Sequence, residues 1–394
     1  MQIRRFLALL FGTFAIVVVF LFLSRQAWWS LPETSRVAIT QVLLSRWLNP
    51  EYLGANRPAD QLLLCNPMGL AFNSDGELLI SDRGRGRRGR VVWRIDASGV
   101  ARIVAGTGRI GDASEREANR MTFDRPEALA VAEDGAVFLS DGFNHAVFRI
   151  APDGAVDRVA GTGKPGFSGD GGVGANAQLS RPADLRLDRS GNLYIADVRN
   201  HRVRMLDSEG RITTVAGTGE KGFSPDGTLA TKARLDTPWG LGLDLEDRLL
   251  IGDAGNQRVR RVNHDGRLVT LAGNGTQGYE GDGGNALEAS LNYPEALSMD
   301  QRGRLFIGDE WNNAIRVVDT NGVISTVMGT GFPGRAEFGG VARLSPVDDP
   351  ENILVTPDGL VIADGNNGRV IRIGNDGIVH LVAGRSETAP CLPP

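Results

Sequence analysis

Short apolar runs alternate with polar turns along most of the chain. In one representative stretch the runs cover residues 183–187, 192–196, 201–206 and 211–216, and two of the turns between them begin with Asp and end with Gly. Runs of this length bounded by such turns are typical of β-strands. The run Val137-Phe138-Leu139 is apolar at every position, which is typical of a strand covered on both faces. The pattern predicts an all-β protein built from packed sheets.

This pattern repeats six times with a nearly constant period. Each unit opens at a proline, and the spacing is 59 residues once and then 56: Pro67, Pro126, Pro182, Pro238, Pro294 and Pro350. The second run of each unit ends in an aspartate: Asp82, Asp141, Asp197, Asp253, Asp309 and Asp364. Units of about four strands whose faces are both covered favour a six-bladed β-propeller, with a solenoid as the alternative.

The residues around the recurring aspartates resemble the NHL repeat. Segments 141–145 and 197–203 carry this resemblance, and Thr-Val-Ala-Gly-Thr-Gly followed by Gly-Asp-Gly-Gly is similar to the longer NHL-type repeats of teneurin-like and exported bacterial proteins. The resemblance covers about residues 65–385. It implies the propeller fold and leaves the activity open, because such propellers host unrelated functions.

The N-terminal region differs from the repeats. An uncharged apolar run, residues 6–23, follows Arg4 and Arg5 and precedes Trp28 and Trp29. Its length is close to the roughly 20 residues that span a bilayer, and no small-residue cleavage site follows it. We predict an uncleaved signal anchor in residues 1–29, with the N-terminus in the cytoplasm because positive flanks stay inside. A removed signal peptide is the alternative, and both export the same domain.

Two further domains complete the prediction: a stalk with a short amphipathic helix in residues 30–64, and the propeller in residues 65–394. The 43 basic and 47 acidic residues leave a net charge of −4, without the basic excess of a dedicated nucleic-acid binder. The two cysteines, Cys65 and Cys391, flank the repeats, so the closed ring would bring them together. We predict a Cys65–Cys391 disulfide, which the exterior of the cell permits; two unrelated thiols are the alternative.

The positions after each proline open the innermost strand at the mouth of the channel. Four units place an acid there: Glu127, Asp184, Glu295 and Glu351. Close carboxylates repel unless they are protonated or bridged by a cation, and Ca²⁺ or another divalent cation takes such oxygen ligands. The mouth is therefore a candidate metal site, as the architectural similarity to senescence-marker/gluconolactonase propellers also implies. An acidic rim that binds nothing is the alternative.

The same face carries candidate binding groups. The first unit has a longer turn with five arginines, which pair well with oxyanions or acidic glycans: Arg83, Arg85, Arg87, Arg88 and Arg90. Three aromatic residues add surfaces for sugars or protein partners: Phe143, Trp239 and Trp311. A solvated loop, and aromatics that pack against loops, are the alternatives.

Other recurring groups are predicted to be structural. The strand aspartate and the Asn three residues later are expected to bond the turn backbone. The Gly-Asp-Gly-Gly segments at Asp170 and Asp282, and the variant at Asp226, lack the ligand spacing of a known calcium loop and are expected to form turns.

Groups for nucleophilic or zinc catalysis are scarce. The four histidines, His145, His201, His264 and His380, form no evident triad or zinc set. The sequence therefore favours a membrane-anchored, exported scaffold that binds a protein or glycan of the cell envelope, with no nucleic-acid partner. The alternative is a metal-dependent hydrolase of lactonase type, in which a cation held by Glu127, Glu295 and Glu351 acts as a Lewis acid.

Overall fold

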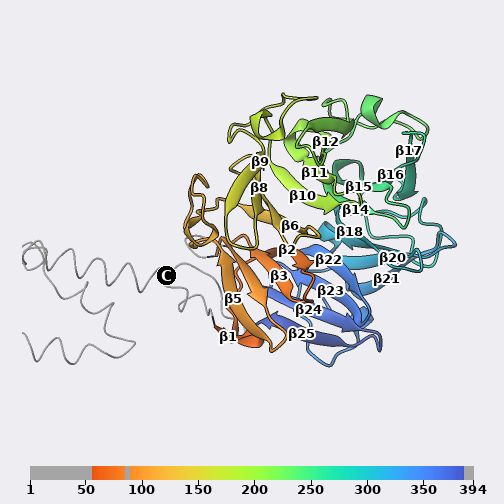
Figure 1. Ribbon diagram of the computed structural model, residues 1–394. Helices are drawn as coiled ribbons and strands as arrows, with labels where there is room; N and C mark the ends of the chain where they lie inside the picture. The colour runs from red at the N-terminus through yellow and green to blue at the C-terminus, as the bar shows by residue number, and fades with distance from the viewer. Residues whose placement is uncertain (1–55, 85–88, 386–394) are drawn as a thin grey trace, which may run out of the picture. The chain divides into compact units, whose positions relative to one another are not determined.

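The computed structural model describes residues 56–84 and 89–385. These residues form six antiparallel sheets, which we number as blades in chain order (Figure 1). Each sheet holds four consecutive strands in sequence order, and blade 1 gains a fifth strand, β1 (Arg57–Pro58), beside its outermost strand. The predicted strands of the third repeat differ from the observed ones by one residue or less at each end.

The strand bounds show the regularity of the repeat. Blade 1 contains β2 (Pro67–Phe72), β3 (Leu78–Asp82), β4 (Val91–Ile95) and β5 (Val100–Ala105). Blade 2 contains β6 (Pro126–Val131), β7 (Val137–Asp141), β8 (Ala146–Ile150) and β9 (Val156–Ala160). Blade 3 contains β10 (Pro182–Leu187), β11 (Leu193–Asp197), β12 (Arg202–Leu206) and β13 (Ile212–Ala216).

The second half of the ring continues in the same way. Blade 4 contains β14 (Pro238–Leu243), β15 (Leu249–Asp253), β16 (Arg258–Val262) and β17 (Leu268–Ala272). Blade 5 contains β18 (Pro294–Met299), β19 (Leu305–Asp309), β20 (Ala314–Val318) and β21 (Ile324–Gly329). Blade 6 contains β22 (Pro350–Thr356), β23 (Gly359–Asp364), β24 (Arg369–Gly374) and β25 (Val379–Gly384).

Short 3-10 helices join these strands. One set lies in the loops that connect successive blades: η2 (Ala118–Arg120), η3 (Gly174–Asn176), η5 (Ala230–Lys232) and η8 (Ala342–Leu344). A second set follows the second strand of blades 3, 4 and 5: η4 (Val198–Asn200), η6 (Ala254–Asn256) and η7 (Glu310–Asn312). η1 (Ala59–Gln61) precedes blade 1.

The six sheets close into a ring around their first strands. β2 contacts both β6 and β22, so the first blade touches the second and the last (Figure 1). This closure confirms the six-bladed propeller and excludes the solenoid. The innermost strands approach closely: a Cβ added to Gly240 of β14 would lie 1.3 Å from the carbonyl oxygen of Glu295 in β18. Glycine is required at this position because the next blade's backbone occupies the place of a side chain.

Apolar cores fill the spaces between neighbouring blades. In the seam that joins the ends of the ring, Leu64 and Trp93 from the start of the propeller pack with Val361 and Val370 of blade 6. Leu62 and Leu64 are buried, with exposed fractions of 0% and 3%. Arg57 to Leu64, which the sequence assigns to the stalk, thus cover the edge and the seam of the propeller.

The predicted anchor (residues 1–29, with its apolar core at 6–23) and the predicted stalk helix lie outside the described residues. No helix within 56–84 or 89–385 is long and apolar enough to cross a membrane. The anchor therefore stays a prediction from the sequence.

The predicted disulfide is described at one end only. Cys65 is disulfide-bonded, whereas Cys391 lies outside the described residues. We expect the native protein to show no free thiol when it is unfolded in denaturant and titrated with a thiol reagent. Two thiols per chain would contradict the predicted ring-closing bond, and reduction before the titration gives the control count of two.

The strand aspartate and the following Asn form a structural network, as predicted. In blade 3, Asp197 accepts a hydrogen bond from the backbone N–H of Ser180 at 2.7 Å and from Asn200 Nδ2 at 2.7 Å. Asn200 Nδ2 also donates to the carbonyl oxygen of Gly166 at 2.8 Å. Since Gly166 belongs to the loop between blades, this network places that loop and the turn after the second strand on the same face, which we call the mouth face.

Buried arginines that the sequence analysis did not identify hold the Gly-Asp-Gly-Gly loops. Arg204 of β12 has no exposed side-chain surface and lies 2.6 Å from Asp170 and 3.6 Å from Asp197. Arg260 and Arg316 repeat the arrangement in blades 4 and 5, with the loop aspartates Asp226 and Asp282. The loop aspartates are thus engaged in ion pairs, which agrees with the predicted structural role and disfavours a calcium loop.

Candidate functional site

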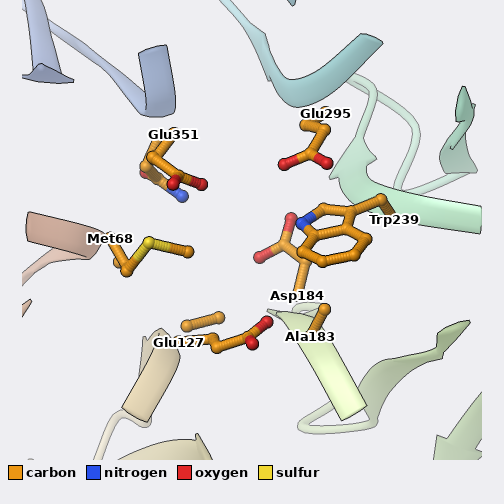
Figure 2. A pocket seen from close by; sticks show the side chains of 10 residues that line it. Met68, Glu127, Ala183, Asp184, Trp239, Glu295 and Glu351 are labelled. Atoms are coloured by element: carbon orange, nitrogen blue, oxygen red, sulfur yellow. The ribbon is translucent and has the colours of Figure 1, made fainter. Parts of the chain in front are cut away.

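The predicted acids do converge at the channel mouth. Figure 2 shows the side chains of Glu127, Asp184, Glu295 and Glu351 around one cavity, with Met68, Ala183 and Trp239 beside them. Glu127, Asp184 and Glu295 are buried, with exposed fractions of 3, 7 and 4%, and the side chain of Glu351 is 4% exposed. The cavity has a volume of ≈ 20 Å³ for water-sized molecules, which suits about one water.

Asp184 is fully engaged by the fold. One carboxylate oxygen accepts hydrogen bonds from the backbone N–H of Leu185 and from Arg186 Nη1, each at 2.8 Å. The other oxygen accepts from the backbone N–H of Leu241 in blade 4, also at 2.8 Å. Asp184 therefore links blades 3 and 4, and its burial raises the pKa of its carboxyl above the ordinary value. A role as a metal ligand would require breaking these bonds.

Two arginines neutralise Glu127. Arg125 Nε forms a close ion pair with Glu127, and Arg181 Nε lies 3.8 Å from the same oxygen, Oε1. Neither carboxylate oxygen of Glu127 has an aligned hydrogen-bond donor. The geometry is thus an ion pair without directed hydrogen bonds, in the buried rim of the cavity.

Arg83 lies beside the acids that blades 5 and 6 contribute to the mouth. Its Nη2 is 3.6 Å from Glu351 Oε1. Burial opposes the charge of Arg83, but the nearby carboxylates, led by Glu351 and Glu127, raise the pKa of its guanidinium above the ordinary value. The first arginine of the predicted oxyanion loop therefore pairs with an acid of the mouth.

The other arginines of that loop are described only in part. Arg90 Nε donates to the carbonyl oxygen of Asp124 at 3.1 Å, and Arg85, Arg87 and Arg88 lie outside the described residues. The predicted binding of an oxyanion by this loop stays a prediction.

Two acids missed by the sequence analysis complete the cluster. Glu310, in η7, hydrogen-bonds with Glu295 and with Asp349 through its side chain. Burial, followed by the charge of Glu310, raises the pKa of Glu295 well above its usual range. Burial also raises the pKa of Glu310 to about 8. Carboxylates this close share protons at neutral pH, because full ionisation would place uncompensated like charges side by side.

A comparison of the six repeats identifies the other charged residues of the mouth. The residue after each strand aspartate is small or apolar in four units and charged in two, at Arg83 and Glu310. The residue before each proline also varies, and it supplies Arg125, Arg181 and Asp349 to the mouth. The position after the proline is thus one of three repeat positions whose side chains meet at the mouth.

The mouth carries a fixed aromatic group. Tyr293 and Trp311 stack with their ring centroids 4.5 Å apart and their planes 5° apart. Trp239 lies 6.4 Å from Tyr293 at a tilt of 59°. Trp311 is 55% exposed, so its outer face is open to solvent. Trp239 and Trp311, which the sequence analysis proposes as binding surfaces, both lie against Tyr293, a residue that the sequence analysis did not identify.

The third predicted aromatic lies with the basic side of the mouth. The guanidinium carbons of Arg125 and Arg181 lie 5.1 and 5.8 Å from the ring centroid of Phe143. The Arg181 carbon also lies 4.2 Å from the Trp239 ring centroid. Arg125 and Arg181 therefore join the aromatic residues to Glu127 and form a cationic sector in blades 2 and 3.

Four residues at the mouth have an energetically unfavourable backbone conformation. Arg181, Thr237, Tyr293 and Asp349, the residues before the prolines of blades 3 to 6, have φ between 52° and 64°. Such left-handed conformations are unfavourable for residues with a side chain and are retained where the surroundings determine them. Four of the mouth's side chains are thus held in place by the backbone.

The acids do not form a ready metal centre. Within 56–84 and 89–385, no group of three or more His, Cys, Asp or Glu residues is arranged to hold a metal ion. The physical reason is that arginines or backbone donors engage Glu127, Asp184 and Glu351. The candidate Ca²⁺ set of the sequence analysis therefore converges in space but has its charge balanced from within.

The raised pKa of Glu310 predicts an unusual pH dependence of stability. The folded state retains a proton that the unfolded chain releases above its pKa of about 4.5, and the folded pKa is about 8. This contribution is complete below the unfolded pKa and is lost as the pH rises through the folded one. We expect the thermal midpoint of the wild type to fall by several degrees more than that of Glu310→Gln between about pH 5 and pH 9.

Burial also raises the pKa of the strand aspartates Asp141, Asp197 and Asp309 to about 6 and of Asp253 to about 7. They act in the same direction in both proteins, so the difference between wild type and variant isolates Glu310. Glu246→Gln, at an exposed acid of the opposite face, is the control. Parallel curves for wild type and Glu310→Gln would contradict the shared-proton cluster.

Comparisons with known proteins agree with the repeat. The family model for the teneurin NHL domain matches residues 273–391, and the model for the NHL repeat matches residues 179–205. Mouse teneurin-1 is 26% identical over 363 residues, which are 82% of this chain and 13% of teneurin-1. Human NHL repeat-containing protein 2 is 27% identical over 283 residues, which are 63% of this chain and 39% of that protein. The chain thus spans less than half the length of these relatives.

Solved structures share the fold. A gluconolactonase from Xanthomonas campestris superposes with a TM-score of 0.51 at 15% sequence identity, over 78% of this chain and 85% of that one. This likeness concerns the architecture alone. The six blades, the repeated Asp–Asn network and the partial matches to these family models together show a six-bladed β-propeller built from NHL-like repeats.

Proposed function

We propose that this chain is a membrane-anchored, exported binding scaffold of the cell envelope whose recognition surface is the mouth of the propeller. The NHL-repeat propeller supplies a rigid frame, and loops on such a frame are the usual place for binding. The anchor and the export rest on the apolar run at residues 6–23 and on the basic residues before it.

The observation that carries the proposal is the exposed Trp311. Its indole is 55% exposed, yet it is held flat against Tyr293. A large aromatic surface that is open to solvent and fixed in orientation loses little conformational entropy when a ligand covers it. Tryptophan and tyrosine in such positions dominate the binding energy of many interfaces.

The charges around this aromatic group define the ligand further. Glu295, Glu310 and Glu351 lie in blades 5 and 6, whereas Arg125 and Arg181 lie at the starts of blades 2 and 3. The mouth is therefore acidic on one side and cationic on the other. A protein surface with both signs of charge and an apolar centre fits this arrangement best, because complementary charges fix the orientation of a partner.

The lactonase-type hydrolase receives no specific support. Its three proposed ligands include Glu127 and Glu351, which are paired with arginines. Burial and the charge of Glu310 raise the pKa of the third, Glu295, well above its usual range, which disfavours the ionised form that a metal ligand needs. The binding scaffold is therefore the one function that we propose.

The experiment compares tagged full-length proteins recovered from the membranes of cells that produce them. Wild type, Trp311→Ala and a control, Leu245→Ala, are isolated under mild crosslinking, and the copurifying proteins and glycans are quantified. Leu245 is 47% exposed and lies in the turn between the first two strands of blade 4, on the face opposite the mouth. We expect Trp311→Ala to lose at least about tenfold of a protein partner that wild type and Leu245→Ala retain.

Three outcomes would count against parts of the proposal. Equal recovery of partners by all three proteins would contradict recognition by the mouth. Recovery of a glycan in place of a protein would contradict the partner class. Recovery of the wild type in the soluble fraction would contradict the anchor.

A further inference from the structure

Blade 2 carries a second cavity, apart from the mouth. Its volume is ≈ 510 Å³, which is within the range of ligand-binding pockets. Phe148 of β8 and Val156 and Arg158 of β9 line one wall, and the loop from Asp112 to Arg116 lines another. The repeat itself shows what the fold normally places in this space.

Blade 3 fills the equivalent space with its own loop. Strand register makes Phe148 and Arg158 of blade 2 equivalent to Arg204 and Thr214 of blade 3, because each pair is directly opposed across its last two strands. In blade 3 the ring centroid of Phe167 lies 4.8 Å from the Arg204 guanidinium carbon. Asp170, three residues later, accepts hydrogen bonds from Arg204 and Thr214 at 2.6 and 2.7 Å.

Blades 4 and 5 repeat this filling with the same spacing. Phe223 lies over Arg260 at 5.2 Å and Tyr279 over Arg316 at 5.0 Å. The acids three residues later, Asp226 and Asp282, pair with these same arginines. Each of these blades thus inserts an aromatic ring and a carboxylate into the space outside its third and fourth strands.

Blade 2 lacks both groups. The connection from Ala105 to Pro126 is one residue shorter than the connection from Ala160 to Pro182, and the missing residue is the aromatic. Ser114 stands at the place of the loop aspartate, twelve residues before the proline in each case. The cavity is therefore the space that an aromatic–acid pair occupies in blades 3 to 5.

The walls of the cavity retain the means to bind such a pair. An edge of the Phe148 ring, which is 3% exposed, lines the cavity where blades 3 to 5 place a buried arginine. Arg158 supplies the cation instead: its Nη1 donates to the carbonyl oxygen of Thr162 at 3.3 Å, and within 56–84 and 89–385 it forms no ion pair. The Thr162 hydroxyl oxygen is buried without a hydrogen-bond partner. Of the rim acids, Glu115 pairs with Arg120.

We propose that this cavity binds a segment of a partner protein that presents Phe or Tyr followed three residues later by Asp or Glu. The ring packs on Phe148, and the carboxylate pairs with Arg158 from the position that Asp170 takes in blade 3. The partner thus supplies the aromatic ring and the carboxylate that the loops of blades 3 to 5 supply within this chain. This site is separate from the mouth, so it stands whether or not the mouth is a recognition surface.

The probe is a fluorescent peptide with the sequence of residues 165–172, which contains Phe167 and Asp170. Its anisotropy is measured against the full-length protein in detergent. We expect saturable binding that is abolished by a Phe167→Ala change in the peptide and weakened about tenfold by an Asp170→Asn change. The protein variant Arg158→Leu is expected to weaken binding by a similar factor. It introduces the residue that blade 6 carries at this position, Leu381 opposite Ile371, and so preserves the fold.

Arg149→Thr is the matched control, because Arg149 is the neighbour of Phe148 on β8 and pairs with Asp134 outside the cavity. It is expected to bind the peptide like the wild type. Absence of saturable binding, or equal affinity for the wild type and Arg158→Leu, would overturn the proposal. Competition by 3-phenylpropionate as effective as by unlabelled peptide would also overturn it, since the occupant would then be a small aromatic acid.

Discussion

Arg204→Ala is expected to lower the free energy of unfolding by about 3–5 kcal/mol, the cost of removing one partner from a buried ion pair. The Arg204 side chain has no exposed surface and lies between Asp170 and Asp197. Alanine would leave Asp197 buried without the Arg204 cation and would remove one of the two guanidinium groups that pack on the ring of Phe167, leaving that of Arg202. Denaturant unfolding followed by circular dichroism measures the loss.

Arg211→Ala is the control for this prediction, because Arg211 is 60% exposed and pairs only with the exposed Glu209. It is expected to change the free energy of unfolding by less than about 1 kcal/mol. Arg204→Phe should lose less than Arg204→Ala, because blade 2 holds its own strand aspartate with Phe148 at this position. A loss below about 1 kcal/mol for Arg204→Ala would show that the buried arginine is not what holds the loop.

Trp93→Ala is expected to cost about 3–5 kcal/mol, as do other truncations of large buried aromatics. The indole has no exposed surface and packs in the core where blade 1 meets blade 6. Its Nε1 makes no hydrogen bond, so the loss comes from apolar packing at the seam of the ring. Trp93→Phe, which keeps most of the volume, is expected to lose less.

The site of the damage is as informative as its size. Hydrogen exchange should become faster in β4 and β24, which border the seam, than in β12 on the far side of the ring. Trp311→Ala, at an exposed tryptophan, serves as the control with a change of about 0.5 kcal/mol or less. Uniformly faster exchange in all blades would mean that the ring unfolds as one unit and that Trp93 does not close it.

The sequence predicts the fold well because the same pattern of strands and turns occurs in six repeats. Strand runs, turn residues and the Asp–Asn network recur with a fixed period, so each unit supports the interpretation of the others. Leu62 and Leu64, which the sequence places before the propeller, are buried in the seam between blades 1 and 6. That contact joins the two ends of the propeller and leaves no periodic signal.

The candidate site was predicted in part. The position after the proline gave Glu127, Asp184, Glu295 and Glu351, and they do meet. The charge state of these acids could not be predicted from this position, because the arginines and the two further acids that control it come from other positions of the repeat. Whether a carboxylate is free, paired or protonated depends on the side chains that surround it in the folded protein. These side chains come from several positions of the repeat, so one position alone does not predict the charge state.

Photo-crosslinking at the mouth tests the central claim most directly. A benzoyl-phenylalanine is placed at Trp311 or, as a control of similar exposure on the opposite face, at Leu245, in the full-length protein inside the cells that produce it. The account predicts a discrete crosslinked partner protein for the probe at Trp311 and none for the probe at Leu245. Crosslinks of equal yield from both positions, or a partner captured only at Leu245, would contradict recognition by the mouth of the propeller.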